Sequence, residues 1–400
     1  MRSFRVVNAT LILPDREMPD GAIDVDNGRI GAIGPEHELG GWSGPTVDAA
    51  GSFVVPGFVD LHVHGGDNAD FMDGTVDAFE TVIRAHTRHG TTSIVPTSTV
   101  ARHEQTIAFL KHARVLRRRG AQPQLGLGRV VGAHLYGPYF NEEKVGCHPK
   151  DPARPPTPAE YEQYLEFADV LLTATCAPEL PGAAGFYRAA AAKGVRLNAG
   201  HSNATWTEMA AAYALGLRHV DHLYCAMSSV SSLRDRCGTP MQASMLEFVL
   251  ATADMTTEVI ADGRHLAPEL LRFVAMVKGV DRTALVTDCS RALDQPPDSY
   301  TFGPLDGGEP FYSDGSVGLL PGSPNLASSV RGMDFMVRHM HRQVGLNLPA
   351  AVRMATLTPA TIVGLQDEIG SLAAGKRADL LFLDPDLTVA RVFVGGEAVT

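Results

Sequence analysis

The sequence predicts an α/β protein in which a (β/α)8 barrel carries a small β-sandwich built from both ends of the chain. Eight apolar runs alternate with helical stretches through the middle of the 400 residues, the pattern of a parallel barrel whose strands are buried. Both ends consist of short strands and turns without helices. Since a single barrel takes up about 250 residues, the length leaves room for one small companion domain.

The two ends of the chain supply the predicted sandwich. In the N-terminal part we expect strands over residues 4–7, 10–13, 22–25 and 29–33. The turn sequence at Asp26–Gly28 separates the last two of these. In the C-terminal part we expect strands over residues 380–383 and 389–394, followed by a turn at Gly395-Gly396. The predicted domains are residues 1–55 with 365–400 for the sandwich and residues 56–364 for the barrel.

The predicted barrel strands are residues 53–64, 93–97, 129–135, 170–174, 196–200, 219–223, 257–261 and 284–287. The segments between them that show helical periodicity are residues 76–89, 104–119, 158–168, 183–193, 205–215 and 268–277. A doubly wound open sheet is the main alternative fold. It is disfavoured because no GxGxxG motif occurs at the first turn from strand to helix.

Composition excludes several classes of protein. With 34 basic and 45 acidic residues the formal charge is −11, which argues against a protein that grips nucleic-acid backbones. A content of 44% hydrophobic and 20% charged residues is typical of a globular chain. No stretch approaches the roughly 20 apolar residues of a membrane span. The five cysteines include no CxxC pair, which favours reduced thiols. We expect a cytoplasmic protein without nucleic-acid or membrane partners.

Polar residues of unusual chemistry close several of the predicted strands. In a parallel barrel the active site is built at these carboxyl ends. The first strand ends in Asp60-Leu61-His62-Val63-His64, and the spacing of two residues puts both imidazoles on one side of the strand. Later strands end in His201, His222 and Asp288. Four imidazoles and one carboxylate are therefore expected to converge at one mouth of the barrel.

This set of side chains suits a divalent metal, zinc above all, which favours imidazole and carboxylate ligands. A carboxylate beside such a metal can take a proton from water, because the metal lowers the pKa of water to about 7. Asp288 is the candidate base. A lone histidine is more often part of the core or rim, but an HxH pair followed by His and Asp at later strand ends is the pattern of a metal site.

At this point the sequence resembles a known family. The segment PGFVDLHVHG at residues 56–65, with the histidines and aspartate downstream, resembles the amidohydrolase superfamily. The segments GAHLYGPYFNEEKVGCHP, LNAGHSNAT, HLYCAM, IADGRH, VTD and GSLAAGKRADLLFLD are similar, in order and spacing, to N-acetylglucosamine-6-phosphate deacetylases. The resemblance covers nearly the whole chain. It implies a barrel with a β-sandwich, a homodimer, and hydrolysis of N-acetylglucosamine 6-phosphate to glucosamine 6-phosphate and acetate.

The resemblance also implies roles for individual residues. His201 and His222 match metal ligands, and Asp288 matches the general base that later protonates the leaving amine. His148 matches a histidine that polarises the acetyl carbonyl, and His265 matches one that contacts the sugar.

Three further positions match the substrate side of the family pattern. Cys225 and Ala226 lie in the HLYCAM segment beside the expected phosphate site. Arg234 best matches an arginine that contacts the 6-phosphate, often from the neighbouring subunit. A length change in its loop leaves Arg236 as an alternative.

Two positions depart from the family pattern. Tyr136 stands where the family has a metal-binding glutamate, and a phenol, with a reference pKa of about 10, is a poor substitute. Either the metal lowers that pKa enough for tyrosinate to bind, or the metal moves toward His62 and His64 with a later histidine and Asp288. We favour the second. Cys225 replaces an asparagine near the phosphate, which weakens the inference of a phosphorylated substrate and leaves the chemistry unaffected.

Two alternative functions remain. The same scaffold could act on an unphosphorylated N-acetyl hexosamine or on another amide, as the changes at Tyr136 and Cys225 suggest. It could also be a sugar-binding protein that lost catalysis with the glutamate. Retention of Asp288 and of the four histidines favours an enzyme.

Overall fold

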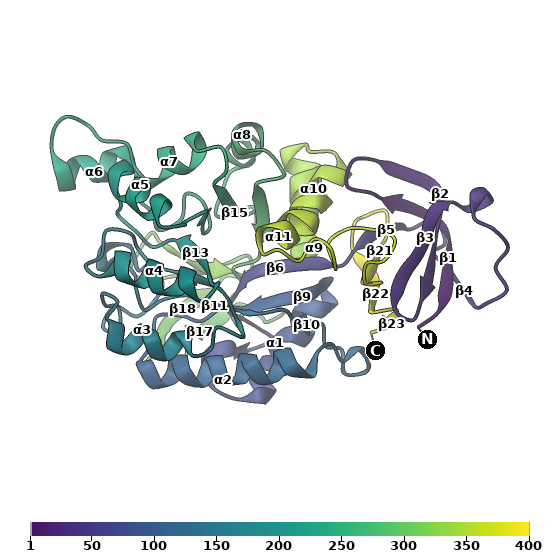
Figure 1. Ribbon diagram of the computed structural model, residues 1–400, viewed down its shortest axis with the longest axis horizontal. Helices are drawn as coiled ribbons and strands as arrows, with labels where there is room; N and C mark the ends of the chain where they lie inside the picture. Colours follow the sequence, from purple (N-terminus) through teal and green to yellow (C-terminus); the bar gives the residue numbers. More distant parts are fainter. Residues whose placement is uncertain (1, 400) are drawn as a thin grey trace.

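The computed structural model describes residues 2–399. A barrel and a smaller β domain lie next to each other along the long axis of the molecule, and both chain ends lie at the β domain (Figure 1). The fold predicted from the sequence is therefore confirmed. Across the described residues, no helix is both long enough and apolar enough to span a membrane.

Eight strand positions form the barrel, and every pairing between them is parallel. The strands are β6 (Phe58–Val63), β9 (Thr91–Pro96), β10 (Arg129–Val130), β11 (Ala133–Leu135), β12 (Leu171–Thr175), β13 (Arg196–Ala199), β14 (His219–Val220), β15 (Thr256–Ile260) and β16 (Thr283–Val286). β10 and β11 together fill the third position, because β10 pairs with β9 and β11 pairs with β12. The ring closes where the N–H of Asp288 donates to the carbonyl of His62 at 2.8 Å.

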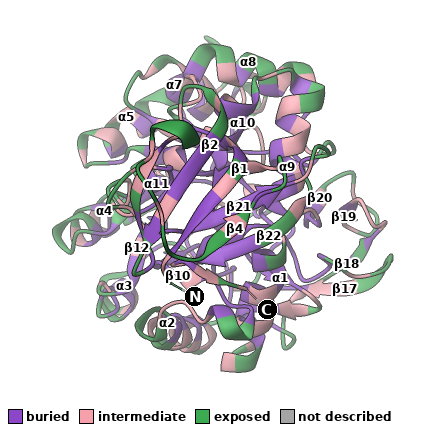
Figure 2. Ribbon diagram, turned by 90° about the vertical axis from the view of Figure 1, so that its right-hand side faces the viewer, coloured by how far each residue is buried: buried purple, intermediate pink, exposed green. Residues whose placement is uncertain are grey.

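The helices surround the barrel and turn their exposed faces outward, around the buried strands (Figure 2). They are α1 (Val76–Arg88), α2 (His103–Arg119), α3 (Pro158–Leu165), α4 (Ala183–Ala192), α5 (Trp206–Ala214), α6 (Val230–Cys237), α7 (Met245–Ala251), α8 (Pro268–Lys278), α9 (Met333–His339), α10 (Leu348–Ala355) and α11 (Leu357–Ile362). Several of these helices begin at a residue whose side chain caps the free N–H groups of the first turn. The Thr75 hydroxyl accepts the N–H of Ala78 at the start of α1, and Thr205 forms a capping box with Glu208 at the start of α5.

The β domain joins the two ends of the chain in one eight-stranded sheet. Its strands are β1 (Phe4–Ile12), β2 (Glu17–Asp26), β3 (Arg29–Pro35), β4 (Thr46–Asp48), β5 (Phe53–Pro56), β21 (Leu380–Leu383), β22 (Val389–Val394) and β23 (Glu397–Ala398). β5 lies between β1 and β21. The Phe393 ring contacts Phe4 and Phe382, each at 5.4 Å between centroids, so residues from both ends share one core.

Several predicted strand boundaries differ from the structure, and two of these differences concern the β domain. Residues 53–64 are not one barrel strand: β5 belongs to the β domain and β6 to the barrel, with Gly57 between them. A Cβ at Gly57 would lie 2.0 Å from the Thr92 side chain, so the chain crosses between the domains where no side chain fits. The predicted strands 4–7 and 10–13 are one strand, β1, which ends at Ile12 and whose register shifts around Asn8, a residue with φ of 54°. The domain limits at 55/56 and 364/365 remain our proposal.

A four-stranded antiparallel sheet follows the last barrel strand and was not expected from the sequence. It comprises β17 (Asp298–Phe302), β18 (Glu309–Ser313), β19 (Val317–Leu319) and β20 (Leu326–Ser329). The ring of Phe302 lies 5.0 Å from those of His64 and His148. This sheet therefore packs against the carboxyl end of the barrel, where the site residues gather.

Candidate metal centre

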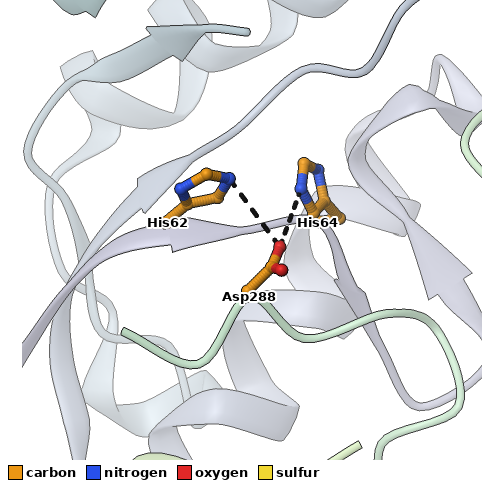
Figure 3. Close-up of side chains that lie close together, drawn as sticks. All are labelled: His62, His64 and Asp288. Carbon is orange, nitrogen blue, oxygen red and sulfur yellow. Dashed lines mark ion pairs between the residues drawn. The ribbon is translucent and has the colours of Figure 1, made fainter. Parts of the chain in front are cut away.

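His62, His64 and Asp288 form the centre of the site (Figure 3). His62 lies near the end of β6, His64 directly follows that strand, and Asp288 follows β16 in the neighbouring strand position. Asp288 Oδ1 lies 3.2 Å from His64 Nε2 and 3.7 Å from His62 Nε2. One ligand atom from each residue lies within 4.8 Å of the other two. The sequence-predicted HxH pair and the predicted base are thus brought together.

Glu258 on β15 fixes the orientation of the His62 ring. His62 Nδ1 lies 3.0 Å from Glu258 Oε2, and His219 Nε2 lies 3.2 Å from Glu258 Oε1. His219 Nδ1 is in turn 2.7 Å from the Thr256 hydroxyl. In the neutral form of His62, a proton on Nδ1 leaves the lone pair of Nε2 free for a metal, the arrangement common to metal-binding histidines.

The carboxylates and the histidines of the centre shift each other's pKa values toward the charged forms. Burial lowers the pKa of His62, but the charge and hydrogen bond of Glu258, with the charge of Asp288, outweigh it and raise the pKa to about 9. Burial raises the pKa of Asp288, but the hydrogen bond of His64 and the charges of both histidines outweigh it and hold that pKa below its usual range. Asp288 is therefore a carboxylate at neutral pH.

The residues present fit a divalent metal. Two imidazoles and a carboxylate are the donors that zinc and similar ions take. His62 Nε2 is buried and has no hydrogen-bond partner within residues 2–399, although buried polar atoms are normally paired. The chemistry of the three donors and the unpartnered Nε2 atom of His62 both indicate a divalent metal.

A second group of possible ligands, His62, Asp221 and Glu258, lies close together in the barrel interior. Both oxygens of Asp221 already accept hydrogen bonds, from the Thr175 hydroxyl at 2.6 Å and from Asn198 at 2.8 Å. Glu258 is held by two histidines. Because these carboxylates are satisfied by the protein, the group is a polar layer beneath the metal centre.

Tyr136 lies at the middle of the histidines. Its ring is 4.4 Å from that of His62 and 5.3 Å from that of His201, and its hydroxyl hydrogen-bonds to Nε2 of His222. Burial, with the negative charge of Asp221 and other carboxylates, raises the pKa of Tyr136 well above its ordinary value. The phenol is therefore neutral in the structure described.

His201 and His222 do not join the compact group of three ligands, although the ring of His222 lies 5.1 Å from that of His62. His201 Nδ1 donates to the carbonyl of Lys144 at 2.6 Å, which leaves Nε2 as an acceptor. Burial is the main cause that lowers the pKa of His222 to about 4 and that of His201 well below its ordinary value. Both imidazoles are neutral, the state that a metal ligand requires.

A cavity of about 410 Å³ opens over the centre. His148 lines it, and Val100 N–H donates to His148 Nδ1 at 3.2 Å. Nε2 of a neutral His148 therefore carries the proton and can donate a hydrogen bond. His265 also lines the cavity, with Nδ1 2.7 Å from Asp262 Oδ2. Burial lowers the pKa of His265, but the hydrogen bond and charge of Asp262 raise it overall.

The substrate-side residues predicted from the sequence divide into two groups. Cys225 and Ala226 line the cavity. Arg234 is exposed on α6 and does not line it. Its alternative, Arg236, donates to the carboxylate of Glu208 at 2.6 Å. Neither arginine thus reaches the cavity of its own chain.

Strained backbone surrounds the cavity. His201, Ala226, Asp288 and Ser328 have φ of 46°, 49°, 45° and 63°, a left-handed conformation that such residues rarely adopt. All four line the cavity. Strain of this kind persists where the surrounding structure imposes it, and it concentrates at functional sites.

Sequence reasoning missed Glu258 and Phe302. Glu258 carried a usable signal, since an acidic residue stands inside the otherwise uncharged strand TTEVI, and a buried carboxylate needs a partner. Phe302 carried none, because it reaches the site through an inserted sheet whose position no local pattern predicts.

Comparisons with known proteins show the family of this chain. The model of the amidohydrolase family matches residues 53–399. The N-acetylglucosamine-6-phosphate deacetylase of Vibrio furnissii is 31% identical over 387 residues, covering 95% of this chain and 91% of the relative. The N-acetylgalactosamine-6-phosphate deacetylase of Escherichia coli O157:H7 is also 31% identical, covering 86% of this chain and 87% of the relative.

Solved structures similar to this chain belong to the same family. The N-acetylglucosamine-6-phosphate deacetylase of Pasteurella multocida has a TM-score of 0.90 at 27% identity and covers 99% of both chains. A Mycobacterium smegmatis N-acetyl-D-glucosamine-6-phosphate deacetylase in complex with N-acetyl-D-glucosamine-6-phosphate has a TM-score of 0.88 at 28% identity over the full length of both chains. The chain therefore belongs to the amidohydrolase family, within its N-acetylglucosamine-6-phosphate deacetylase branch.

Proposed function

We propose that this protein hydrolyses the N-acetyl amide of N-acetylglucosamine 6-phosphate to glucosamine 6-phosphate and acetate. The observation that carries the proposal is the group of His62, His64 and Asp288, of which Asp288 lines a cavity that also holds a hydrogen-bond donor, His148. The activity named for the relatives supports the choice of substrate.

The proposed cofactor is one divalent metal, zinc, held by His62, His64 and Asp288. His201 is the further ligand that this proposal favours, because its Nε2 is free of the hydrogen bond that engages Nε2 of His222. When bound, the metal supplies Lewis-acid polarisation of the amide carbonyl and lowers the pKa of water at the site.

The protein supplies the positioning and the proton transfers. The Nε2–H of His148 donates to the acetyl oxygen and so stabilises the negative charge that develops there. The Asp288 carboxylate accepts the proton of the attacking water and passes it to the nitrogen that leaves.

The cavity also supports an anionic substrate. Lys144 and His265 line it, and the pKa of His265 is raised overall. Arg234, exposed on α6, is available to a neighbouring subunit, so we propose a homodimer in which it completes the phosphate site. The five free cysteines agree with a cytoplasmic enzyme.

Acetate release from N-acetylglucosamine 6-phosphate by the zinc-loaded protein tests the proposal. We expect turnover that Asp288→Asn abolishes, whereas the matched control Asp298→Asn, at an exposed position, retains it. A metal-loaded protein that releases no acetate from any N-acetyl hexosamine or its 6-phosphate would contradict the proposal and favour a sugar-binding protein.

A second candidate is deacetylation of an unphosphorylated or epimeric sugar. Cys225 in the cavity wall and the outward position of Arg234 favour a weaker phosphate site, and one relative is named for N-acetylgalactosamine 6-phosphate. Comparing kcat/KM for the two 6-phosphates and for free N-acetylglucosamine decides between them. A preference for the free sugar would exclude the phosphate site.

A further inference from the structure

A second cavity, of about 520 Å³, lies where the barrel meets the β domain. Its walls come from the carboxyl-terminal end of α2, from the start of β10, and from the turns of the β domain at Gly28 and Gly395. The start of β10 is the amino-terminal end of a barrel strand, so the cavity lies at the end of the barrel opposite to the metal centre.

Positive charge dominates this cavity. Its wall carries six arginine side chains and only two carboxylates, those of Glu368 and Glu397. The arginines are Arg2, Arg29, Arg117, Arg119, Arg129 and Arg377. This concentration of cations occurs on a chain whose formal charge is −11, so overall composition does not account for it.

Four carboxylates, those of Glu397, Glu368, Glu80 and Asp379, pair with five of the six arginines, so the cations still outnumber their carboxylate partners. Arg29 and Arg377 face each other across an isolated antiparallel bridge, and like charges placed directly opposite each other are destabilising. They share one carboxylate, Glu368, at 3.0 and 3.4 Å. Burial and the charge of Arg129 lower the pKa of Arg377, as expected where cations outnumber anions.

Arg117 is the least compensated of the six. Its guanidinium donates to the backbone carbonyl of Asp169, and no carboxylate within residues 2–399 lies at ion-pair distance from it. Arg119 beside it pairs with Glu80 at 2.7 Å. The dipole of α2 favours cations in its last turn, which explains these two arginines but not the four supplied by β10 and the β domain.

We propose that this cavity binds a small phosphate-bearing anion that links the barrel to the β domain. Guanidinium groups form paired hydrogen bonds with phosphate oxygens, and a concave wall of one charge concentrates the field that attracts such an anion. The volume suits a small molecule. This proposal does not depend on the proposed function, because no catalytic residue takes part.

Calorimetric titration with inorganic phosphate, at ionic strength held constant with chloride, tests the site. We expect a Kd below about 1 mM that rises about tenfold in Arg117→Gln and in Arg119→Gln, because each loses charge-assisted hydrogen bonds. Arg16→Gln, an exposed arginine of the β domain paired with Asp15, is the matched control and leaves the Kd unchanged.

Two further measurements complete the test. Phosphate raises the Tm of the wild type, as any ligand of the folded state does, and raises it less in Arg117→Gln. Repeating the titration with glucosamine 6-phosphate identifies the source of the anion: affinity tenfold tighter than for phosphate assigns a phosphorylated sugar, and equal affinity assigns free phosphate. The absence of phosphate binding, or binding that survives both cavity substitutions, overturns the proposal.

Discussion

Substitution of Glu258 by glutamine weakens metal binding without touching the metal. Glutamine keeps the shape of the side chain but removes the charge that holds the proton on Nδ1 of His62, 3.0 Å away. An amide group can donate to Nδ1, which favours the tautomer with its proton on Nε2 and removes the lone pair that faces Asp288. Loss of a partner that orients a metal-binding histidine typically costs 10- to 100-fold in affinity.

We therefore expect the Kd for zinc to rise about 10- to 100-fold in Glu258→Gln, which is about 1.4 to 2.7 kcal/mol. Competition with a chromophoric chelator measures this value. Glu247→Gln is the matched control, because Glu247 also accepts hydrogen bonds, from Ser244, but lies outside the site. A folded Glu258→Gln protein that binds zinc as tightly as the wild type would refute the reasoning.

Three further predictions follow from the same structure. Tyr136→Glu places a carboxylate among the histidines and should tighten zinc binding in the same chelator assay; unchanged affinity would mean that position 136 does not face the metal. His148→Gln should lower kcat about 10²-fold or more with little change in KM, since it removes a donor to the developing oxyanion; a change confined to KM would contradict this. His89 pairs with Asp294 at 3.0 Å and Asp334 at 2.9 Å; burial lowers its pKa, but these bonds raise it to about 9. The stability that the His89 ion pairs contribute is therefore complete below about pH 6.5 and is lost as the pH rises through about 9. The Tm should fall across that interval in the wild type and should fall less in His89→Gln. Parallel profiles of Tm against pH for the two proteins would contradict this prediction.

The parts of the site that the sequence predicted are those encoded locally. His62 and His64 can be recognised in the sequence because polar residues interrupt an apolar run where a strand ends. Asp288 can be recognised in the same way, at the end of a later apolar run. Glu258 reaches His62 across 196 positions of sequence, and only the closed barrel makes them neighbours. The same limitation hid the inserted sheet that carries Phe302.

The strand boundaries failed for a related reason. The run from residue 53 to 59 has no polar side chain, because the chain is buried on both sides of Gly57, in one domain and then in the other. Periodicity alone does not show where a buried chain passes from one core to another. Gly57 marks the point, but its meaning depends on Thr92, which belongs to a strand 35 positions away.

The position of β5 also determines the order in which the protein can mature during synthesis. Its backbone pairs with β1, made just before it, and with β21, made last. Until residues 380–383 leave the ribosome, one edge of β5 has no strand partner, and unpaired strand edges are sites of aggregation. If the ribosome stalls within the barrel, the apolar segment FVVP is therefore an unpaired strand edge that can aggregate. Truncation before β21 would leave the N-terminal strands of the sheet without the strand that pairs with β5.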